Sequence, residues 1–194
     1  MTFTPRLERA IRIAAHAHRN QSRKGSDTPY IIHPFSVMAI ASEVTDDEDT
    51  LIACLFHDIL EDVPNEYPEA TMRKEFGSRV VEIVLGVTKN DHIHAWHDQC
   101  QAYLEKLKNN APDESVIVSA ADKIHNLMSV VSDYDEIGER VWQKFSAGNP
   151  DDQLWWYGSV LETIKERQAP PKLINKLSGL ITELREKTGK PAGI

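Results

Sequence analysis

The spacing of the apolar residues constrains the fold most strongly, because apolar residues recur every three to four positions along most of the chain. This is the period of an amphipathic helix. Two runs, residues 80–85 and 115–120, are rich in β-branched residues, but no alternating hairpin pattern flanks them. The helical period covers residues 7–19, 34–44, 49–62, 78–88, 97–109, 114–134, 152–167 and 173–189. Short turn-rich segments separate these runs, and no internal repeat or long linker is present. The sequence predicts an all-α fold with one domain over residues 1–194.

Composition excludes several classes of protein. The hydrophobic fraction of 41% and the charged fraction of 27% are typical of a globular domain. No run of 18 apolar residues occurs, and the charged N-terminus does not resemble a signal peptide, so neither a membrane span nor secretion is expected. Cys54 and Cys100 are then interpreted as reduced thiols of a cytoplasmic protein. A net charge of −8 argues against nonspecific nucleic-acid binding. The oligomeric state stays open.

The segment FHDILED, residues 56–62, places four ionisable side chains at the end of an apolar run. On a continuous helix His57 and Glu61 lie one turn apart. Asp58 and Asp62 have the same spacing, so all four side chains share one quadrant. Burying several carboxylates beside apolar residues costs on the order of several kcal/mol per charge. A divalent cation bound by the histidine and one aspartate would offset this cost. The alternative is an exposed helix end whose acidic residues are merely solvated.

Two other positions strengthen the metal hypothesis. His33 precedes Pro34, which is suited to the first position of a helix. Asp122 lies among small apolar residues of a predicted helix, where an unpartnered carboxylate is unfavourable. Together with the HD dipeptide these residues form a ligand set of nitrogen and oxygen atoms without sulfur. Such a set suits Mn²⁺, Fe²⁺ or Zn²⁺, and the share of carboxylates favours Mn²⁺. The predicted ligands are His33, His57, Asp58 and Asp122.

Other histidines and aromatic residues compete for a functional role. His92, His94 and His97 are a competing candidate for a metal site, but they lie in a polar stretch without matching carboxylates. We therefore interpret them as surface residues or as neighbours of the substrate. His16 and His18 end the first predicted helix and are interpreted as structural. Trp155 and Trp156 are predicted to be core residues, although closure over a bound ligand is an alternative.

Four motifs in order resemble the HD-type hydrolase domain of the RelA/SpoT family. They are HRNQSRKGSDTPYIIHP, LFHDILEDVP, GVTKN and SAADKIHNLMSV, within about residues 18–131. The layout is similar to that of stand-alone small alarmone hydrolases. The resemblance implies a helical bundle of the HD type, with the C-terminal helices completing it. It also implies a hydrolase alone, without the synthetase domain of the long members.

The resemblance assigns roles residue by residue. The metal ligands of the family fall on the four residues already predicted, and its catalytic acidic pair falls on Glu61 and Asp62. Those two would orient a water molecule and take its proton. Lys123 stands where the family usually has Arg, which matters most for a bidentate contact. Tyr30 would pack beneath the site, and Lys89 is left unassigned. The implied substrate-binding residues are Arg23, Lys24, Lys123 and Asn126.

The activity implied by the family is removal of the 3′-pyrophosphate from purine nucleotide alarmones with one Mn²⁺ per chain. The substrate would be ppGpp or pppGpp, or the adenosine analogues ppApp or pppApp, because a stacked arginine accepts either purine. One alternative is an HD phosphohydrolase acting on another ribose-phosphorylated nucleotide such as NADPH. A second alternative is a nucleotide-binding module without catalysis. The expected partner is therefore a small nucleotide, with no nucleic acid and no membrane.

Overall fold

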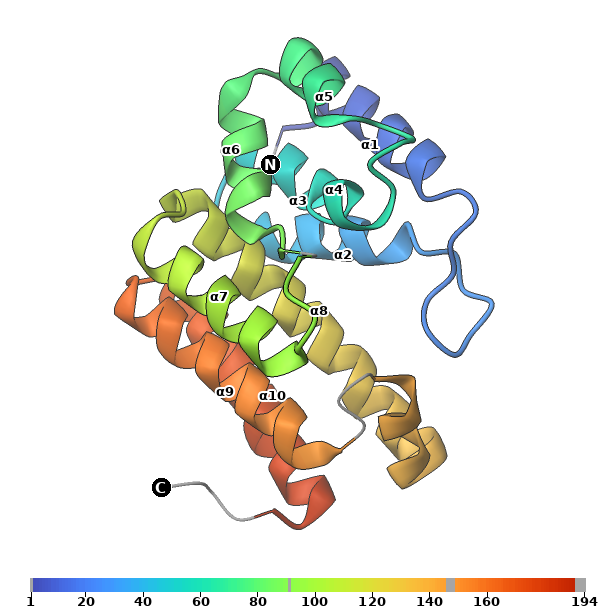
Figure 1. The fold of residues 1–194 in the computed structure, drawn as a ribbon, viewed down its shortest axis with the longest axis vertical. Coiled ribbons are helices and arrows are strands. Elements are labelled where there is room, and N and C mark those ends of the chain that lie inside the picture. Colours follow the sequence, from blue (N-terminus) through green and yellow to red (C-terminus); the bar gives the residue numbers. More distant parts are fainter. Residues whose placement is uncertain (1, 91, 146–148, 191–194) are drawn as a thin grey trace.

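The computed structural model describes residues 2–90, 92–145 and 149–190, and within these ranges the protein is helical, without strands (Figure 1). The predicted all-α class is thus confirmed. The helices are α1 (Pro5–Ala17), α2 (Ile32–Ala41), α3 (Glu48–Phe56), α4 (Ile59–Asp62), α5 (Glu69–Phe76), α6 (Ser78–Val87), α7 (Trp96–Asn109), α8 (Asp113–Ile137), the 3₁₀ helix η1 (Gly138–Lys144), α9 (Pro150–Glu166) and α10 (Pro171–Thr188).

Helix starts follow the local sequence. Thr4 and Asn149 accept a hydrogen bond from the first turns of α1 and α9, and each helix has proline at its first position. Asp47 caps α3 by accepting from the backbone N–H of Thr50 at 3.0 Å. The helix that contains His33 begins at Ile32, two residues before the predicted start at Pro34. The structure also contains α5 and η1, which the apolar spacing did not predict.

The predicted helix over residues 49–62 is interrupted at His57 and Asp58. Helix α3 ends at Phe56, and α4 resumes at Ile59. The His57 side chain donates to the carbonyl oxygen of Cys54 at 2.8 Å, which is the acceptor that a continuous helix would offer to the N–H of Asp58. The interruption therefore has a local cause in the histidine, and it presents both His57 and Asp58 at a turn.

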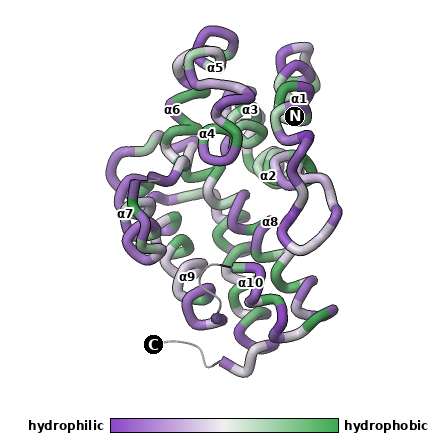
Figure 2. The backbone as a smooth tube through the Cα atoms, turned by 45° about the vertical axis from the view of Figure 1, so that its right-hand side comes forward, coloured by the Kyte–Doolittle hydropathy of each residue, from purple (hydrophilic) through white to green (hydrophobic). Residues whose placement is uncertain are grey.

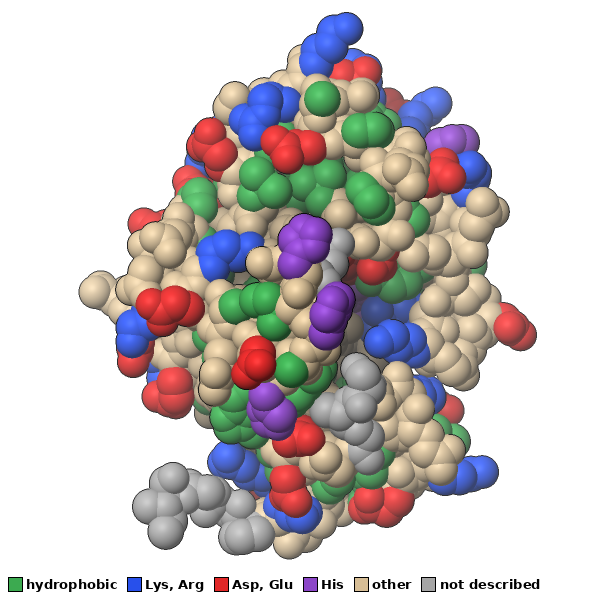
Figure 3. All heavy atoms as spheres, in the orientation of Figure 1, with side chains coloured by type: hydrophobic (Ala, Val, Ile, Leu, Met, Phe, Trp, Pro, Cys, Tyr) green, Lys and Arg blue, Asp and Glu red, His purple; other side chains and the backbone are tan. Residues whose placement is uncertain are grey.

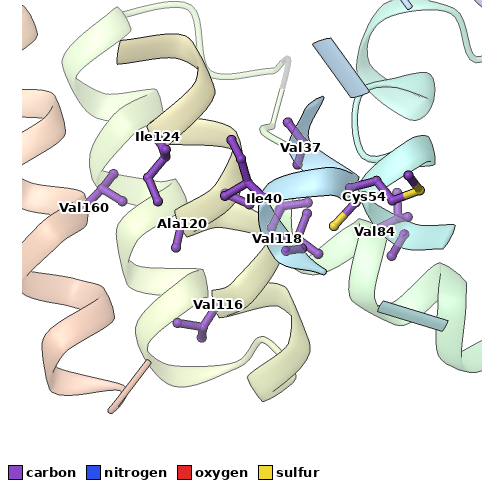
Figure 4. Packing of buried hydrophobic residues seen from close by; sticks show 14 of the residues in the cluster. Val37, Ile40, Cys54, Val84, Val116, Val118, Ala120, Ile124 and Val160 are labelled. Carbon is purple, nitrogen blue, oxygen red and sulfur yellow. The ribbon is translucent and has the colours of Figure 1, made fainter. Parts of the chain in front are cut away.

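Helix α8 lies at the centre of the molecule, with α2, α3 and α6 on one side and α9 and α10 on the other (Figure 1). Ile124 of α8 faces Val160 of α9, while Ile40 of α2 approaches α8 from the opposite direction (Figure 4). Figure 2 shows hydrophobic residues concentrated where the helices face one another. Within the described ranges, no helix is both long and apolar enough to cross a membrane. The central position lets α8 supply residues to a site between the two halves.

Candidate metal centre

A cleft of about 780 Å³ lies between α2, the α3–α4 turn and α8, with further walls from α9 and η1. The predicted metal ligands, the predicted acidic pair and the predicted substrate-binding residues all line this cleft. They are Arg23, Lys24, His33, His57, Asp58, Glu61, Asp62, Asp122, Lys123 and Asn126. Residues as far apart in the sequence as Arg23 and Asn126, 103 positions, thus meet in one cavity. The predicted site is assembled by the fold rather than by a single helix.

Ligand atoms of the four predicted metal-binding residues converge. His33 Nε2 lies 3.3 Å from His57 Nε2, and His57 Nε2 lies 3.0 Å from Asp58 Oδ2. Among the residues that the structure describes, His33, His57 and Asp58 form the set whose ligand atoms all lie within 4.8 Å of one another. Asp122 is outside this set of three, but its Oδ1 lies 3.2 Å from His33 Nε2 and 3.8 Å from His57 Nε2, so it borders the set on the α8 side. The set of three is compact enough for a single ion.

Both histidines present Nε2 to the centre because Nδ1 is engaged elsewhere. Since the carbonyl oxygen of Cys54 can only accept, His57 must donate from Nδ1, and its neutral form has a bare lone pair on Nε2. His33 Nδ1 lies 2.7 Å from Nδ1 of His125, which orients the second ring. Such outer contacts are what metal-binding histidines commonly make.

The electrostatics of the centre favour a positive charge between these atoms. Burial would lower the pKa of His57, but the charges of Asp58 and Asp122 raise it to about 9. Burial would raise the pKa of Asp58, but the two imidazoles hold it well below its usual range. The pKa of Asp122 is also lowered, because Lys123 and the imidazoles outweigh burial. The two carboxylates thus favour a positive charge at the position they surround, and the nitrogen and oxygen donor set fits a divalent metal.

Asp58 and Asp122 are each oriented by neighbours. The Tyr30 hydroxyl donates to Asp58 Oδ2 at 2.6 Å, so Tyr30 makes a polar contact as well as packing beneath the site. Lys123 Nζ pairs with Asp122 Oδ2 at 2.5 Å, and Asn126 Nδ2 donates to Asp122 Oδ1 at 2.5 Å. Lys123 is buried, with its ammonium over the rings of Tyr103 and Trp156. Asp122 is therefore held on both oxygens.

The acidic pair lies beside the ligands in a different environment. Glu61 accepts a hydrogen bond from the backbone N–H of Lys89. Burial, and then the charge of Asp58, raise the pKa of Glu61 above its ordinary value. Asp62 is more exposed, and the same two causes raise its pKa. Like Asp122, neither carboxylate belongs to the compact set of His33, His57 and Asp58.

Two of the four predicted nucleotide-binding residues, Arg23 and Lys24, lie on the loop before α2, and the other two, Lys123 and Asn126, lie on α8. Arg23 donates to Asn126 Oδ1 at 3.0 Å and lies over the Tyr30 ring, while Lys24 is exposed. Gly25 has a positive φ of 76°, and the Lys144 side chain occupies the space that a Cβ there would need. Lys144 comes from η1, so this contact joins the loop to the C-terminal half of the cleft.

The remaining candidate residues lie outside the ligand group. His92, His94 and His97 are exposed, and His97 pairs with Asp152 at 3.0 Å. Histidine side chains are visible on the surface in Figure 3. His16 belongs to the last turn of α1. His18 is the first residue after this helix and is buried beside the Tyr30 ring. Trp156 is a core residue, as predicted, and its ring also lines the cleft, whereas Trp155 is only partly buried.

Sequence reasoning missed the contacts that orient the ligands. His125 lies three residues after Asp122, and this spacing places both on one face of α8, which is a signal that could have been used. The role of the Tyr30 hydroxyl had no such signal, because it depends on how the loop before α2 meets the α3–α4 turn. The bond from His57 to the Cys54 carbonyl is local, but apolar spacing does not reveal it.

Comparison with known proteins agrees with this geometry. The sequence profile described as HD domain (HD_4) matches residues 10–149, well over half of the chain. The protein therefore belongs to the HD domain family. An Aquifex aeolicus protein named guanosine-3′,5′-bis(diphosphate) 3′-pyrophosphohydrolase is 36% identical over 125 residues, which are 64% of this chain and 18% of the relative. Escherichia coli SpoT, named a bifunctional (p)ppGpp synthase/hydrolase, is 36% identical over 132 residues, 66% of this chain and 18% of SpoT. The predicted resemblance to RelA/SpoT proteins is thus confirmed, although the chain spans less than a fifth of these relatives.

Solved structures support the fold. A structure described as a metazoan ortholog of SpoT that hydrolyses ppGpp superimposes with a TM-score of 0.78 at 23% identity, covering 94% of this chain and 97% of the other. A Listeria monocytogenes protein has a TM-score of 0.66 at 27% identity, covering 77% of this chain and 96% of its own. The helical arrangement of the HD type is shared beyond the matched motifs.

Proposed function

We propose that the protein is a Mn²⁺-dependent hydrolase that removes pyrophosphate from the ribose 3′ position of purine nucleotide alarmones, either ppGpp and pppGpp or their adenosine analogues. The observation that carries this proposal is the convergence of the two imidazoles and the Asp58 and Asp122 carboxylates beside Glu61. The names of the Aquifex and Escherichia relatives support the same reaction. Two nitrogen ligands disfavour Mg²⁺, and the carboxylates favour Mn²⁺, with one ion per chain.

The reaction needs a proton acceptor beside the ligands. A bound divalent ion would supply Lewis acidity and lower the pKa of a water molecule in the cleft. Glu61 and Asp62 are adjacent to the ligands, and we assign them to orient that water and take its proton. The water oxygen forms a bond to the phosphorus that is attached to the ribose 3′-oxygen. The bond between this phosphorus and the 3′-oxygen breaks. The 3′-oxygen takes up a proton, and the products are pyrophosphate and a nucleoside 5′-di- or triphosphate.

Basic residues of the cleft would bind the nucleotide. The Arg23 guanidinium is flat and weakly hydrated, which suits stacking on a purine. Lys24 is exposed at the rim and would neutralise phosphate charge. Lys123 pairs with Asp122 through one donor, and an ammonium has two more to offer to the substrate. Asn126 connects Arg23 to Asp122, so its amide would contact the ribose or a phosphate beside the metal.

We also infer that residues 1–194 act as one domain. Helices α9 and α10 pack on α8, which carries Asp122. Trp156 and Tyr157 of α9 line the same cleft as the ligands. Removing the C-terminal helices would therefore open one wall of the site as well as the core.

A direct test compares product release from ppGpp, ppApp and NADPH by the purified chain with Mn²⁺ and with EDTA. We expect pyrophosphate from at least one alarmone with Mn²⁺ and none with EDTA. The Asp58→Asn variant is the matched inactive control. Phosphate release from NADPH alone would indicate the alternative phosphohydrolase. Tight nucleotide binding without any product would overturn the proposal in favour of a binding module.

A further inference from the structure

Lys106 of α7 directs its ammonium at backbone carbonyls rather than at an acidic side chain. Its Nζ donates to the carbonyl oxygen of Leu85 at 2.8 Å and also to that of Thr88. Both acceptors belong to the C-terminal end of α6 (Ser78–Val87), where carbonyls lack partners within the helix. A cation at a helix C-terminus is also favoured by the helix dipole. Lys106 therefore fixes the turn that follows α6.

The same turn contacts Glu61, one of the two carboxylates proposed to take the proton of the water. The carbonyl of Thr88 and the N–H of Lys89 belong to one peptide group, and in a trans peptide they point in opposite directions. Lys106 holds the carbonyl side of this group, while Glu61 accepts from the N–H side. The peptide is thus held at both ends. Hydrogen bonds in such a chain polarise one another. The ammonium of Lys106 therefore strengthens the hydrogen bond that the N–H of Lys89 donates to Glu61.

Burial and charge agree with this arrangement. Lys106 is partly buried, and burial lowers its pKa while the charge of Glu61 acts in the opposite direction. Within the described parts of the chain, Lys106 makes no ion pair, whereas Lys108 on the same helix pairs with Glu166 at the surface. A partly buried ammonium without a carboxylate partner has its full charge available to the backbone turn.

We propose that Lys106 is a positioning residue that fixes the orientation of Glu61 through the Thr88–Lys89 peptide. This inference rests on the proposed function, because it supports the role assigned to Glu61 there. Lys106 touches neither the ligand residues nor the loop of Arg23, so it acts on the step that Glu61 performs and not on metal or nucleotide binding.

The test uses Lys106→Met, which removes the donors, and Lys106→Arg, which keeps them. Lys108→Met is the matched control, since it removes an exposed ammonium from the same helix. We expect Lys106→Met to lower kcat by about 10- to 100-fold, the usual effect of an outer contact. KM and bound Mn²⁺ should change less than about twofold, and Lys106→Arg should recover part of kcat. Lys108→Met should match the unmodified protein.

A second readout does not depend on turnover. The amide resonance of Lys89 should shift in Lys106→Met and in Glu61→Gln, and it should stay in place in Lys108→Met. If Lys106→Met does not fold, Lys106→Gln with its weaker neutral donor takes its place and should give an intermediate kcat.

The two proposals fail separately. A chain that releases no product with any nucleotide overturns the proposed function, and the Lys89 resonance then still decides whether Lys106 is coupled to Glu61. An active chain in which Lys106→Met keeps its kcat, or leaves the Lys89 resonance in place, overturns the positioning role.

Discussion

Asp58 and Glu61 are carboxylates three residues apart, yet their surroundings favour different protonation states. The imidazoles hold the pKa of Asp58 well below its usual range against the effect of burial, so Asp58 stays ionised, as the proposed ligand role requires. Burial and the charge of Asp58 raise the pKa of Glu61, which suits a group that takes and returns a proton. Pairs of carboxyl groups whose pKa values are shifted apart are typical of a division between charge and proton transfer.

The first prediction separates these roles. Asp58→Asn should lose the bound metal, because an anionic ligand becomes neutral. Glu61→Gln and Asp62→Asn should each bind about one Mn²⁺ per chain and still bind the nucleotide, while kcat falls by roughly 10²–10⁴ as for a lost general base. Plasma spectrometry measures the metal content, calorimetry measures nucleotide binding, and single-turnover hydrolysis measures the rate of the chemical step. If both variants of the acidic pair lost their metal, Glu61 and Asp62 would be ligands.

The second prediction concerns Arg23, which lies over the Tyr30 ring and lines the cleft. Arg23→Ala should raise KM by more than it lowers kcat, because a stacking contact is made in both the ground state and the transition state. Arg19→Ala is a matched control, since Arg19 pairs with Glu66 at the surface. Steady-state kinetics with each purine alarmone give both constants. An unchanged KM for every substrate would make Arg23 an ordinary surface charge.

At the scale of elements, the start of α3 determines where His57 and Asp58 are placed. Asp47 accepts from the N–H and the hydroxyl of Thr50 and pairs with Arg79. Asp47→Ala should lower the free energy of unfolding at pH 7 by about 1 kcal/mol, the usual value of an N-cap. Asp47→Asn should lower the free energy of unfolding by less, because asparagine also caps helices. Chemical denaturation measures both.

The pH dependence of this cap has a definite sign. Burial would raise the pKa of Asp47, but the hydrogen bonds from Arg79 and Thr50 lower it in the folded state. Its contribution is therefore present above the unfolded pKa of about 3.9 and is lost as pH falls through the lower folded value. The difference in unfolding free energy between the unmodified protein and Asp47→Ala should shrink in that acidic range. A constant difference down to pH 2 would contradict it.

The helices that apolar spacing predicted are those whose buried face repeats over several turns, as in α8 and α10. Helix α5 was missed because its eight residues bury only Met72 and Phe76. The interruption at His57 was missed because the side-chain bond to Cys54 replaces a backbone bond, and spacing alone does not reveal such a competition. Local periodicity thus predicts long helices better than short ones.

At the scale of the whole molecule, the candidate ligand residues could be proposed from the sequence, whereas the contacts that support them could not. Imidazole and carboxylate in apolar surroundings are costly, and this chemistry is visible in the sequence at His57 and Asp122. The contacts of Tyr30 and Lys106 depend on how distant helices meet, since each involves a partner at least 18 residues away. Their residue types alone carry no such information.

The last prediction follows from the separate origins of the ligands, because α2, the α3–α4 turn and α8 meet only in the folded chain. A metal that binds the folded state alone stabilises it by RT ln(1 + [L]/Kd), which is about 2.7 kcal/mol at one hundred times Kd. For a chain of this size that corresponds to a rise in Tm of roughly 5–10 °C. Chelation by EDTA should remove the increment, and Mn²⁺ should restore it better than Mg²⁺, which prefers oxygen ligands. Differential scanning calorimetry measures each Tm, and the Asp58→Asn variant should show little response to Mn²⁺. Equal Tm values with EDTA and with saturating Mn²⁺ would mean that these helices are not joined by a metal.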